Sequence, residues 1–149
     1  MKIPAKGFTH GGKFHADDVF STALLQILRP DIQIIRGFTV PDDFDGIVVL
    51  PAYMPWKNGL YKTDALFVVY PSQRGGYSAQ CVNDHRTKRS KLPFPPAWAG
   101  RPEEELRRVS GLGLRFCHPS RFLITADDKA TAIEACRRTL RAAGRPVSE

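Results

Sequence analysis

One stretch near the start of the chain decides its fold, Gly7-Phe8-Thr9-His10-Gly11-Gly12-Lys13-Phe14-His15-Ala16-Asp17-Asp18. A short run that predicts a strand ends at His10, a glycine turn follows, and two aspartates then begin a helix. Because the turn is short, the imidazoles of His10 and His15 and the carboxylate of Asp17 gather where the strand passes into the helix. This spacing predicts a site at the carboxyl end of the first strand.

The three side chains form a set that is typical of metal ligands. Mixed imidazole and carboxylate ligation suits manganese, iron or zinc better than magnesium alone. A metal held there activates water for attack on a phosphodiester. A plainer interpretation fits the same residues, with His15 at the surface, Asp17 capping the helix and Gly11-Gly12 forming only a tight turn.

The pattern of apolar residues predicts an α/β protein in two parts. The first part, 1–50, is expected to run strand, helix, strand, turn and buried strand, with these elements at 6–10, 17–28, 32–36 and 46–50. A segment rich in proline and aromatic residues, 51–63, is expected to be a linker. The second part, 64–149, is a predicted α+β lobe, with a hairpin at 64–70 and 77–82, a helix at 102–110, strands at 114–118 and 122–126, and a final helix capped by Asp127-Asp128.

Composition narrows the class of protein and of partner. The chain has 149 residues, of which 42% are hydrophobic and 25% charged, a balance that argues against disorder. Its formal net charge of +7 favours polyanionic partners such as RNA or phosphorylated substrates. Three cysteines with no pairing pattern indicate reduced, buried thiols in a cytoplasmic protein. We expect no signal peptide, and no apolar run approaches the roughly 18 residues that span a membrane.

Two segments of the second part are candidate substrate contacts. The basic loop with Arg86, Lys88 and Arg89 is predicted to follow a phosphate backbone, although a solvated loop is the simpler interpretation. His118 and Arg121 lie in a turn between two predicted strands, where they hold a phosphate or form only a surface turn. The aromatic residues of this part, Tyr77, Phe94 and Trp98, and also Cys117, are expected to belong to the core rather than to a site.

The opening stretch resembles the first motif of the MYG family, which belongs to the DHH phosphoesterase superfamily. The match runs through Thr9-His10-Gly11-Gly12-Lys13-Phe14-His15-Ala16-Asp17-Asp18. The second part resembles the carboxyl-terminal part of the same family, as in Lys91-Leu92-Pro93-Phe94-Pro95-Pro96-Ala97-Trp98-Ala99-Gly100 and Phe116-Cys117-His118-Pro119-Ser120-Arg121-Phe122. The resemblance implies a metal-dependent phosphoesterase with a 3′–5′ RNA exonuclease role, Mn²⁺ as the ion, and His10, His15 and Asp17 as ligands.

The chain also departs from that family. Family members carry an aspartate after the third strand and then an Asp-His-His motif, whereas here Leu50 is followed by Pro51 and no Asp-His-His occurs. The resemblance thus implies a truncated β-α-β half of a DHH-like domain, followed by the small α+β lobe. Three interpretations stay open: an impaired phosphoesterase, an inert remnant that binds phosphate or RNA, and a deletion product whose exposed sheet edge favours self-association.

Overall fold

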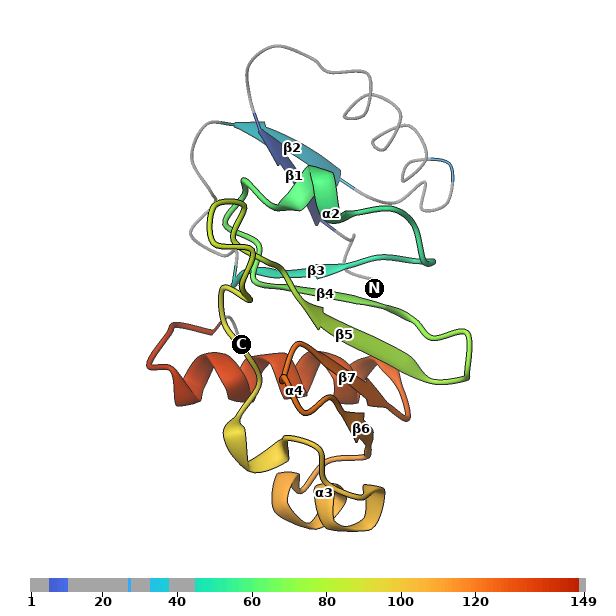
Figure 1. Cartoon of the computed structure of the whole chain (residues 1–149). Helices are drawn as coiled ribbons and strands as arrows, with labels where there is room; N and C mark the ends of the chain where they lie inside the picture. The colour runs from blue at the N-terminus through green and yellow to red at the C-terminus, as the bar shows by residue number, and fades with distance from the viewer. Residues whose placement is uncertain (1–5, 11–26, 28–32, 38–44, 148–149) are drawn as a thin grey trace. The chain divides into compact units, whose positions relative to one another are not determined.

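A computed structural model describes residues 6–10, 27, 33–37 and 45–147 of the chain. Its internal contacts divide the protein into two compact units, Met1–Phe44 and Asp45–Glu149. Each unit is described by itself, and Figure 1 labels the elements of both. The α/β class expected from the sequence is confirmed, since the described chain combines a five-stranded sheet with helices.

The first unit contains a pair of parallel strands. Strand β1 (Lys6–His10) pairs with β2 (Gln33–Gly37), with Lys6 opposite Gln33 and His10 opposite Gly37. Both strands are where the sequence predicts them, the second within one residue. A parallel pair needs a crossover connection. The helix predicted for that crossover lies outside the described residues except for Ile27, which is helical.

The second unit is built on a five-stranded sheet in the order β3-β4-β5-β7-β6. Its strands are β3 (Ile47–Val49), β4 (Phe67–Pro71), β5 (Tyr77–Cys81), β6 (Leu114–Cys117) and β7 (Leu123–Ala126). Strand β3 is parallel to β4, and all other neighbours are antiparallel. The helices are α2 (Lys57–Leu60), the 3₁₀ turn η1 (Pro96–Trp98), α3 (Glu103–Ser110) and α4 (Lys129–Ala142). The predicted hairpin and the two longer helices are confirmed.

Strand β3 belongs to the second unit, which places the division between the units earlier than residue 50. Its partner is β4, and the carbonyl of Gly46 accepts hydrogen bonds from the amides of Leu66 and Phe67 at 2.7 and 3.0 Å. Gly46 has a φ of +83°, and an added Cβ would meet the Leu66 side chain at 3.0 Å. A glycine is therefore required where the chain enters this sheet. The segment 51–63, expected to be a linker, is also packed, since it contains α2 and the buried Trp56.

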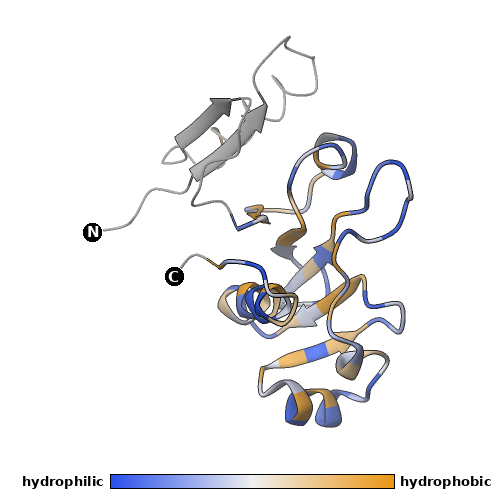
Figure 2. Ribbon diagram, turned by 90° about the vertical axis from the view of Figure 1, so that its left-hand side faces the viewer, coloured by the Kyte–Doolittle hydropathy of each residue, from blue (hydrophilic) through white to orange (hydrophobic). Residues whose placement is uncertain are grey.

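The core of the second unit lies between the sheet and α4. Phe67 and Val69 of β4, with their cross-strand partners Cys81 and Ala79, belong to one cluster of buried side chains. Helix α4 adds a face of small residues to this cluster, including Ala132, Ala135 and Cys136, which lets the helix lie close to the sheet. In Figure 2 hydrophobic residues concentrate on the strands. Burying a side chain the size of Phe67 contributes about 1.5–3 kcal/mol.

Phe94, Trp98 and the thiol of Cys117 are core groups, as the sequence predicts, and Tyr77 is partly buried against the same core. The ring of Phe94 packs against Phe67 and Trp98, with centroids 5.2 and 6.3 Å apart. All three cysteines are free and buried. Burial raises the pKa of the Cys117 thiol to about 11, so at neutral pH the thiol carries its proton and is a poor nucleophile. None of the helices in the described part of the chain is long and apolar enough to span a membrane.

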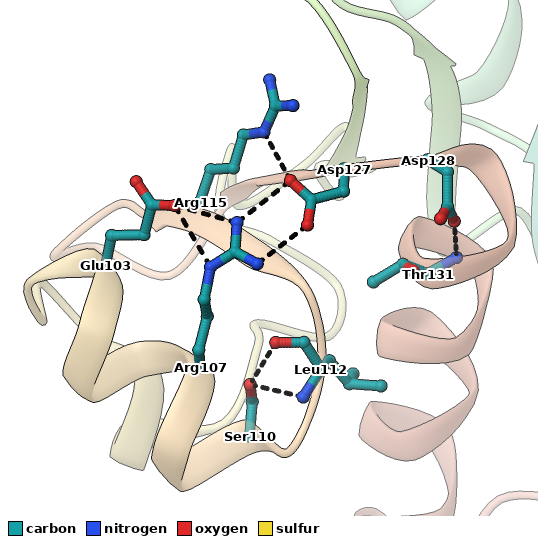
Figure 3. Close-up of polar contacts among 8 residues, drawn as sticks. All are labelled: Glu103, Arg107, Ser110, Leu112, Arg115, Asp127, Asp128 and Thr131. Atoms are coloured by element: carbon teal, nitrogen blue, oxygen red, sulfur yellow. Dashed lines mark hydrogen bonds and ion pairs between the residues drawn. The ribbon is translucent and has the colours of Figure 1, made fainter.

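An ion-pair network joins α3, β6 and the start of α4 (Figure 3). The guanidinium of Arg107 donates two hydrogen bonds to the Asp127 carboxylate, at 2.8 and 3.0 Å, and also contacts Glu103. Arg115 donates to the same carboxylate at 2.7 Å. The next residue, Asp128, caps α4 by accepting from the amide of Thr131 at 2.7 Å. The predicted cap is therefore confirmed, and only one of the two aspartates performs it.

We expect the Asp127 network to make stability depend on acidity. Hydrogen bonds from Arg107 and then Arg115 lower the pKa of the Asp127 carboxyl in the folded chain. Its contribution is therefore present above the unfolded-state pKa, about 4, and is lost as pH falls through the lower folded pKa. Asp127→Asn should lower Tm at pH 7, and the difference from wild type should shrink at pH 3. Thermal denaturation followed by circular dichroism measures both.

A charge-matched control on α3 is Glu104→Gln, which removes an exposed carboxylate outside this network. It should change Tm much less at pH 7. A Tm difference for Asp127→Asn that stays constant down to pH 3 contradicts the network as the cause.

Candidate functional site

A surface hollow of about 670 Å³ lies in the second unit. Its walls come from three segments that are far apart in the sequence, 56–61, 80–93 and 120–122. Figure 1 shows α2, which carries the first wall, beside the loop that follows β5. The floor lies where β5 ends and β7 begins, because Gln80 and Leu123 are paired across these strands.

The hollow is strongly cationic. Four basic side chains line it, Lys57, Lys88, Arg89 and Arg121, and no acidic side chain of the described residues does. Like charges that converge on a concave surface raise the local concentration of anions. The arginines add planar groups that bind two oxygens of a phosphate or carboxylate at once. The hollow is therefore suited to an anion with several oxygens.

The basic loop is held in shape by Asp84. Its carboxylate accepts from the amides of Arg86 and Thr87 at 2.8 Å each, and these bonds lower its pKa. The backbone of Asp84 also binds Arg89 and Lys88 at 2.8 and 2.9 Å. The loop is thus a closed turn with fixed backbone hydrogen bonds. Its basic side chains are presented from a rigid base rather than from a free coil.

Arg121 is held in place at both ends. Its amide donates to the carbonyl of His118 at 2.8 Å, and its carbonyl accepts from the amide of Phe94 at 2.9 Å. The guanidinium donates to the carbonyl of Phe94 at 3.2 Å. A guanidinium anchored through one nitrogen keeps its remaining N–H groups in a fixed direction. The side chain of Arg121 therefore loses little further conformational entropy when it binds an anion.

Lys88 and Arg121 share a strained backbone. They have φ values of 61° and 60°, and they are the two non-glycine residues with positive φ in the described chain. The left-handed conformation costs an L-residue roughly 1–2 kcal/mol. Such residues persist where the surrounding structure holds them, and they cluster at binding sites. Both strained residues are cations that line the same hollow, which links the strain to this site.

The structure brings together three of the five predicted substrate-binding residues. Lys88, Arg89 and Arg121 line the hollow, whereas Arg86 and His118 do not. Arg86 is exposed, and its amide donates to the Asp84 carboxylate. The ring of His118 packs on Phe122, with centroids 4.5 Å apart, and its Nδ1 accepts from the amide of Ser120 at 3.0 Å. The role of each of the five in binding substrate stays a prediction.

Sequence reasoning missed the wall that comes from the expected linker. Trp56, Lys57 and Tyr61 line the hollow, and so does Gln80 in the middle of the sheet. No local pattern marks them, because the hollow joins segments that are separated by long stretches of chain. Lys91 has a different role from its basic neighbours. Its ammonium donates to the carbonyls of Thr63 and Ala65, and burial lowers its pKa, so it fastens the loop rather than facing a ligand.

Cys81 forms part of the floor as a structural thiol. Its Sγ donates to the carbonyl of Leu92 at 3.2 Å and to that of Arg121 at 3.5 Å. Burial raises the pKa of the thiol to about 12. A protonated, almost fully buried thiol is a poor nucleophile. Cys81 therefore connects two walls of the hollow and is not a reacting group.

The predicted metal ligands lie at the edge of what the structure describes. His10 is the last residue of β1, at the carboxyl end of a parallel strand, where ligand sites form in open sheets. His15 and Asp17 lie outside the described residues. Within 6–10, 27, 33–37 and 45–147, histidine, cysteine and acidic side chains form no group of three able to hold a metal.

Comparison with known proteins identifies relatives. The sequence model MYG1_exonuc, described as Uncharacterised protein family (UPF0160), matches residues 37–140. The chain is 34% identical over 124 residues to MYG1 exonuclease of Rattus norvegicus, covering 76% of the chain and 32% of the relative. With MYG1 exonuclease of Homo sapiens the identity is 34% over 117 residues, covering 72% and 31%. The MYG1 protein of Dictyostelium discoideum is 33% identical over 88 residues, covering 52% and 26%.

The match therefore spans about a third of the length of the first relatives. No solved structure has a significant match to the chain. The matched region includes the whole hollow.

We expect replacement of Lys88 by glycine to leave the chain as stable as wild type or more stable. Glycine removes the strain of the left-handed backbone, roughly 1–2 kcal/mol, and adds about 0.5–1 kcal/mol of unfolded-state entropy. The free energy of unfolding should thus rise by up to about 1.5 kcal/mol. Urea denaturation measures it.

The matched control is Arg86→Gly in the same turn, where φ is not positive. At this position glycine only increases the conformational entropy of the unfolded chain, so the substitution should lower the free energy of unfolding. Equal losses in the two variants would show that the Lys88 backbone is unstrained.

Proposed function

This chain belongs to the MYG1_exonuc family (UPF0160), and we propose that it is a metal-dependent phosphodiester hydrolase whose second unit binds a substrate phosphate in the hollow. Relatives in this family are named exonucleases, enzymes that release nucleotides from a chain end. One observation carries the proposal. Lys88, Arg89 and Arg121 converge on a hollow that no acidic side chain within residues 45–147 lines, and two of these cations have a strained backbone.

The substrate that we propose is RNA, bound through its phosphates. Hydrogen bonds to charged groups contribute about 1.5–3 kcal/mol each. Two or three such contacts give useful affinity without any contact to a base. The net charge of +7 assists by attracting a polyanion from a distance. We also place the protein in the cytoplasm, because its three buried free thiols suit a reducing compartment.

The first unit would hold the metal. His10, His15 and Asp17 are the proposed ligands, and their imidazole and carboxylate donors fit Mn²⁺ as well as iron or zinc. The position of His10 at the carboxyl end of β1 supports this assignment. A divalent ion bound there supplies a Lewis acid and an activated water. The residues of the hollow contribute binding and orientation of the phosphate, and they neutralise its charge.

A second candidate function is binding without turnover. The sequence contains no Asp-His-His motif, so ligands for a second ion are not supplied by that motif. In-line cleavage then loses one of the two ions that steady the attacking and leaving oxygens. The described residues that line the hollow, by contrast, all belong to the second unit. We therefore propose an enzyme with impaired turnover, and the alternative is an inert protein that keeps the RNA-binding hollow.

We expect single alanine variants of Lys88, Arg89 and Arg121 to weaken binding of a short single-stranded RNA. Each lost phosphate contact should raise Kd roughly 10- to 150-fold and reduce the slope of log affinity against log salt by about 0.7. Fluorescence polarisation in a salt series measures both quantities. The control is Arg108→Ala on α3, which removes an exposed arginine outside the hollow. Equal effects from the control and the hollow variants would mean that only net charge matters.

We expect His15→Ala to abolish specific binding of Mn²⁺. The variant loses an imidazole from the proposed ligand set, whereas His85→Ala removes a histidine of the second unit and should bind as wild type does. Isothermal titration with MnCl₂ compares the three proteins. Identical titrations would remove the metal proposal.

Hydrolysis of bis(p-nitrophenyl) phosphate with and without Mn²⁺ then separates the two candidate functions. Metal-dependent turnover that is lost in His15→Ala supports the enzyme. RNA binding without any turnover supports the inert binder.

A further inference from the structure

Gln80 is a neutral polar residue in the middle of a sheet. It lies on β5, paired with Val68 on one side and Leu123 on the other, and its side chain lines the hollow. Strand positions between two apolar neighbours usually carry apolar side chains. An amide there needs hydrogen-bond partners, because desolvating an unpaired polar group costs about 1–3 kcal/mol.

One end of the Gln80 amide has a fixed partner. The hydroxyl of Tyr70 donates to Oε1 of Gln80 at 3.0 Å. Tyr70 is only 9% exposed, and burial raises the pKa of its hydroxyl, so the group remains a donor throughout the neutral range. Since the oxygen is engaged by Tyr70, the NH₂ end is the one left to serve a ligand. This end offers two N–H donors and no acceptor.

The two kinds of donor in the hollow suit two kinds of oxygen. The lysine and arginine groups favour charged oxygens, for which charge-assisted bonds are about twice as strong as neutral ones. A neutral amide competes poorly for a phosphate that such cations surround. It is better matched to a hydroxyl or carbonyl oxygen beside the phosphate. Trp56, Tyr61 and Phe122 also line the hollow and give part of it an aromatic wall.

We propose that Gln80 is a specificity-determining residue, whose amide NH₂, oriented by Tyr70, donates to an uncharged oxygen that the ligand carries next to its phosphate. This inference rests on the proposed function, because it takes phosphate binding by the hollow as given. A site built to bond such an oxygen discriminates strongly against a ligand that lacks it. Tyr70 acts through Gln80 and is a positioning residue.

The test compares ligands that share a phosphate and differ in their uncharged oxygens. Inorganic phosphate, ribose 5-phosphate, 2-deoxyribose 5-phosphate and uridine 5′-monophosphate are titrated calorimetrically into the intact chain. Gln80→Leu keeps the side-chain volume similar and removes the amide. We expect this substitution to raise Kd for the sugar phosphates or the nucleotide roughly 5- to 20-fold. Kd for inorganic phosphate should rise less than twofold. A loss seen with ribose 5-phosphate assigns the contact to a sugar hydroxyl, and a loss confined to the nucleotide assigns it to a base carbonyl.

Two further variants separate specificity from packing. Gln80→Glu keeps an oxygen for the Tyr70 hydroxyl but places a negative charge in the hollow, so all four ligands should bind more weakly. Tyr70→Phe should repeat the ligand-selective loss of Gln80→Leu to a smaller extent, with an unchanged Kd for inorganic phosphate. A variant that only loosened the fold would weaken every ligand alike.

The outcomes also distinguish this inference from the proposed function. If Gln80→Leu weakens all ligands equally, or weakens none, the inference is overturned while phosphate binding by the hollow stands. If the intact chain binds none of the four ligands, both are overturned. Circular dichroism of each variant confirms that the comparison is made between folded proteins.

Discussion

The burial of strand β4 is the constraint on which the second unit depends. Phe67, Val68 and Val69 are all 0% exposed, so this strand needs a neighbour at each edge and cover on each face. Strand β3 supplies one edge and β5 the other. The amide of Val82 then donates to the carbonyl of Leu66 at 2.8 Å, which continues the pairing beyond β5. The amide of Cys81 donates to the carbonyl of Phe122 at 2.8 Å, which joins a second wall of the hollow to this sheet.

A rigid base explains why the hollow tolerates strained residues. The backbones of Lys88 and Arg121 are held by hydrogen bonds to Asp84, His118 and Phe94, which repay the cost of the left-handed conformation. The free energy that is needed to place these cations is therefore spent during folding. It is not spent again when an anion binds. Preorganisation of this kind raises affinity by reducing the entropy that is lost on binding. A site selected only for stability would carry glycine at such positions.

The sequence predicts this fold well where the signal is local. Alternating residues 77–82, the apolar run 46–50 and the carboxylates before α4 each produce the predicted element, because pleat, burial and capping act over a few residues. The strand that pairs with β3 was not predictable, since an apolar run indicates that a strand is buried but not which strand lies next to it in the sheet. Lys57 and Gln80 were missed for the same reason, because tertiary pairing alone brings a turn of α2 and a strand residue into one hollow.

The chemistry divides unequally between the two parts of the chain. In the proposed function, the cations of the hollow would attract substrate and product phosphates about equally, and uniform binding by itself does not speed a chemical step. Acceleration requires groups that act on the charge that develops in the transition state. In the proposed function, those groups belong to the metal motif of the first unit. In the proposed function, a chain that keeps the hollow but has no Asp-His-His motif would therefore lose catalysis before it loses binding. In the proposed function, affinity for RNA and rate of cleavage are separable properties, and affinity alone would not measure an intact active site.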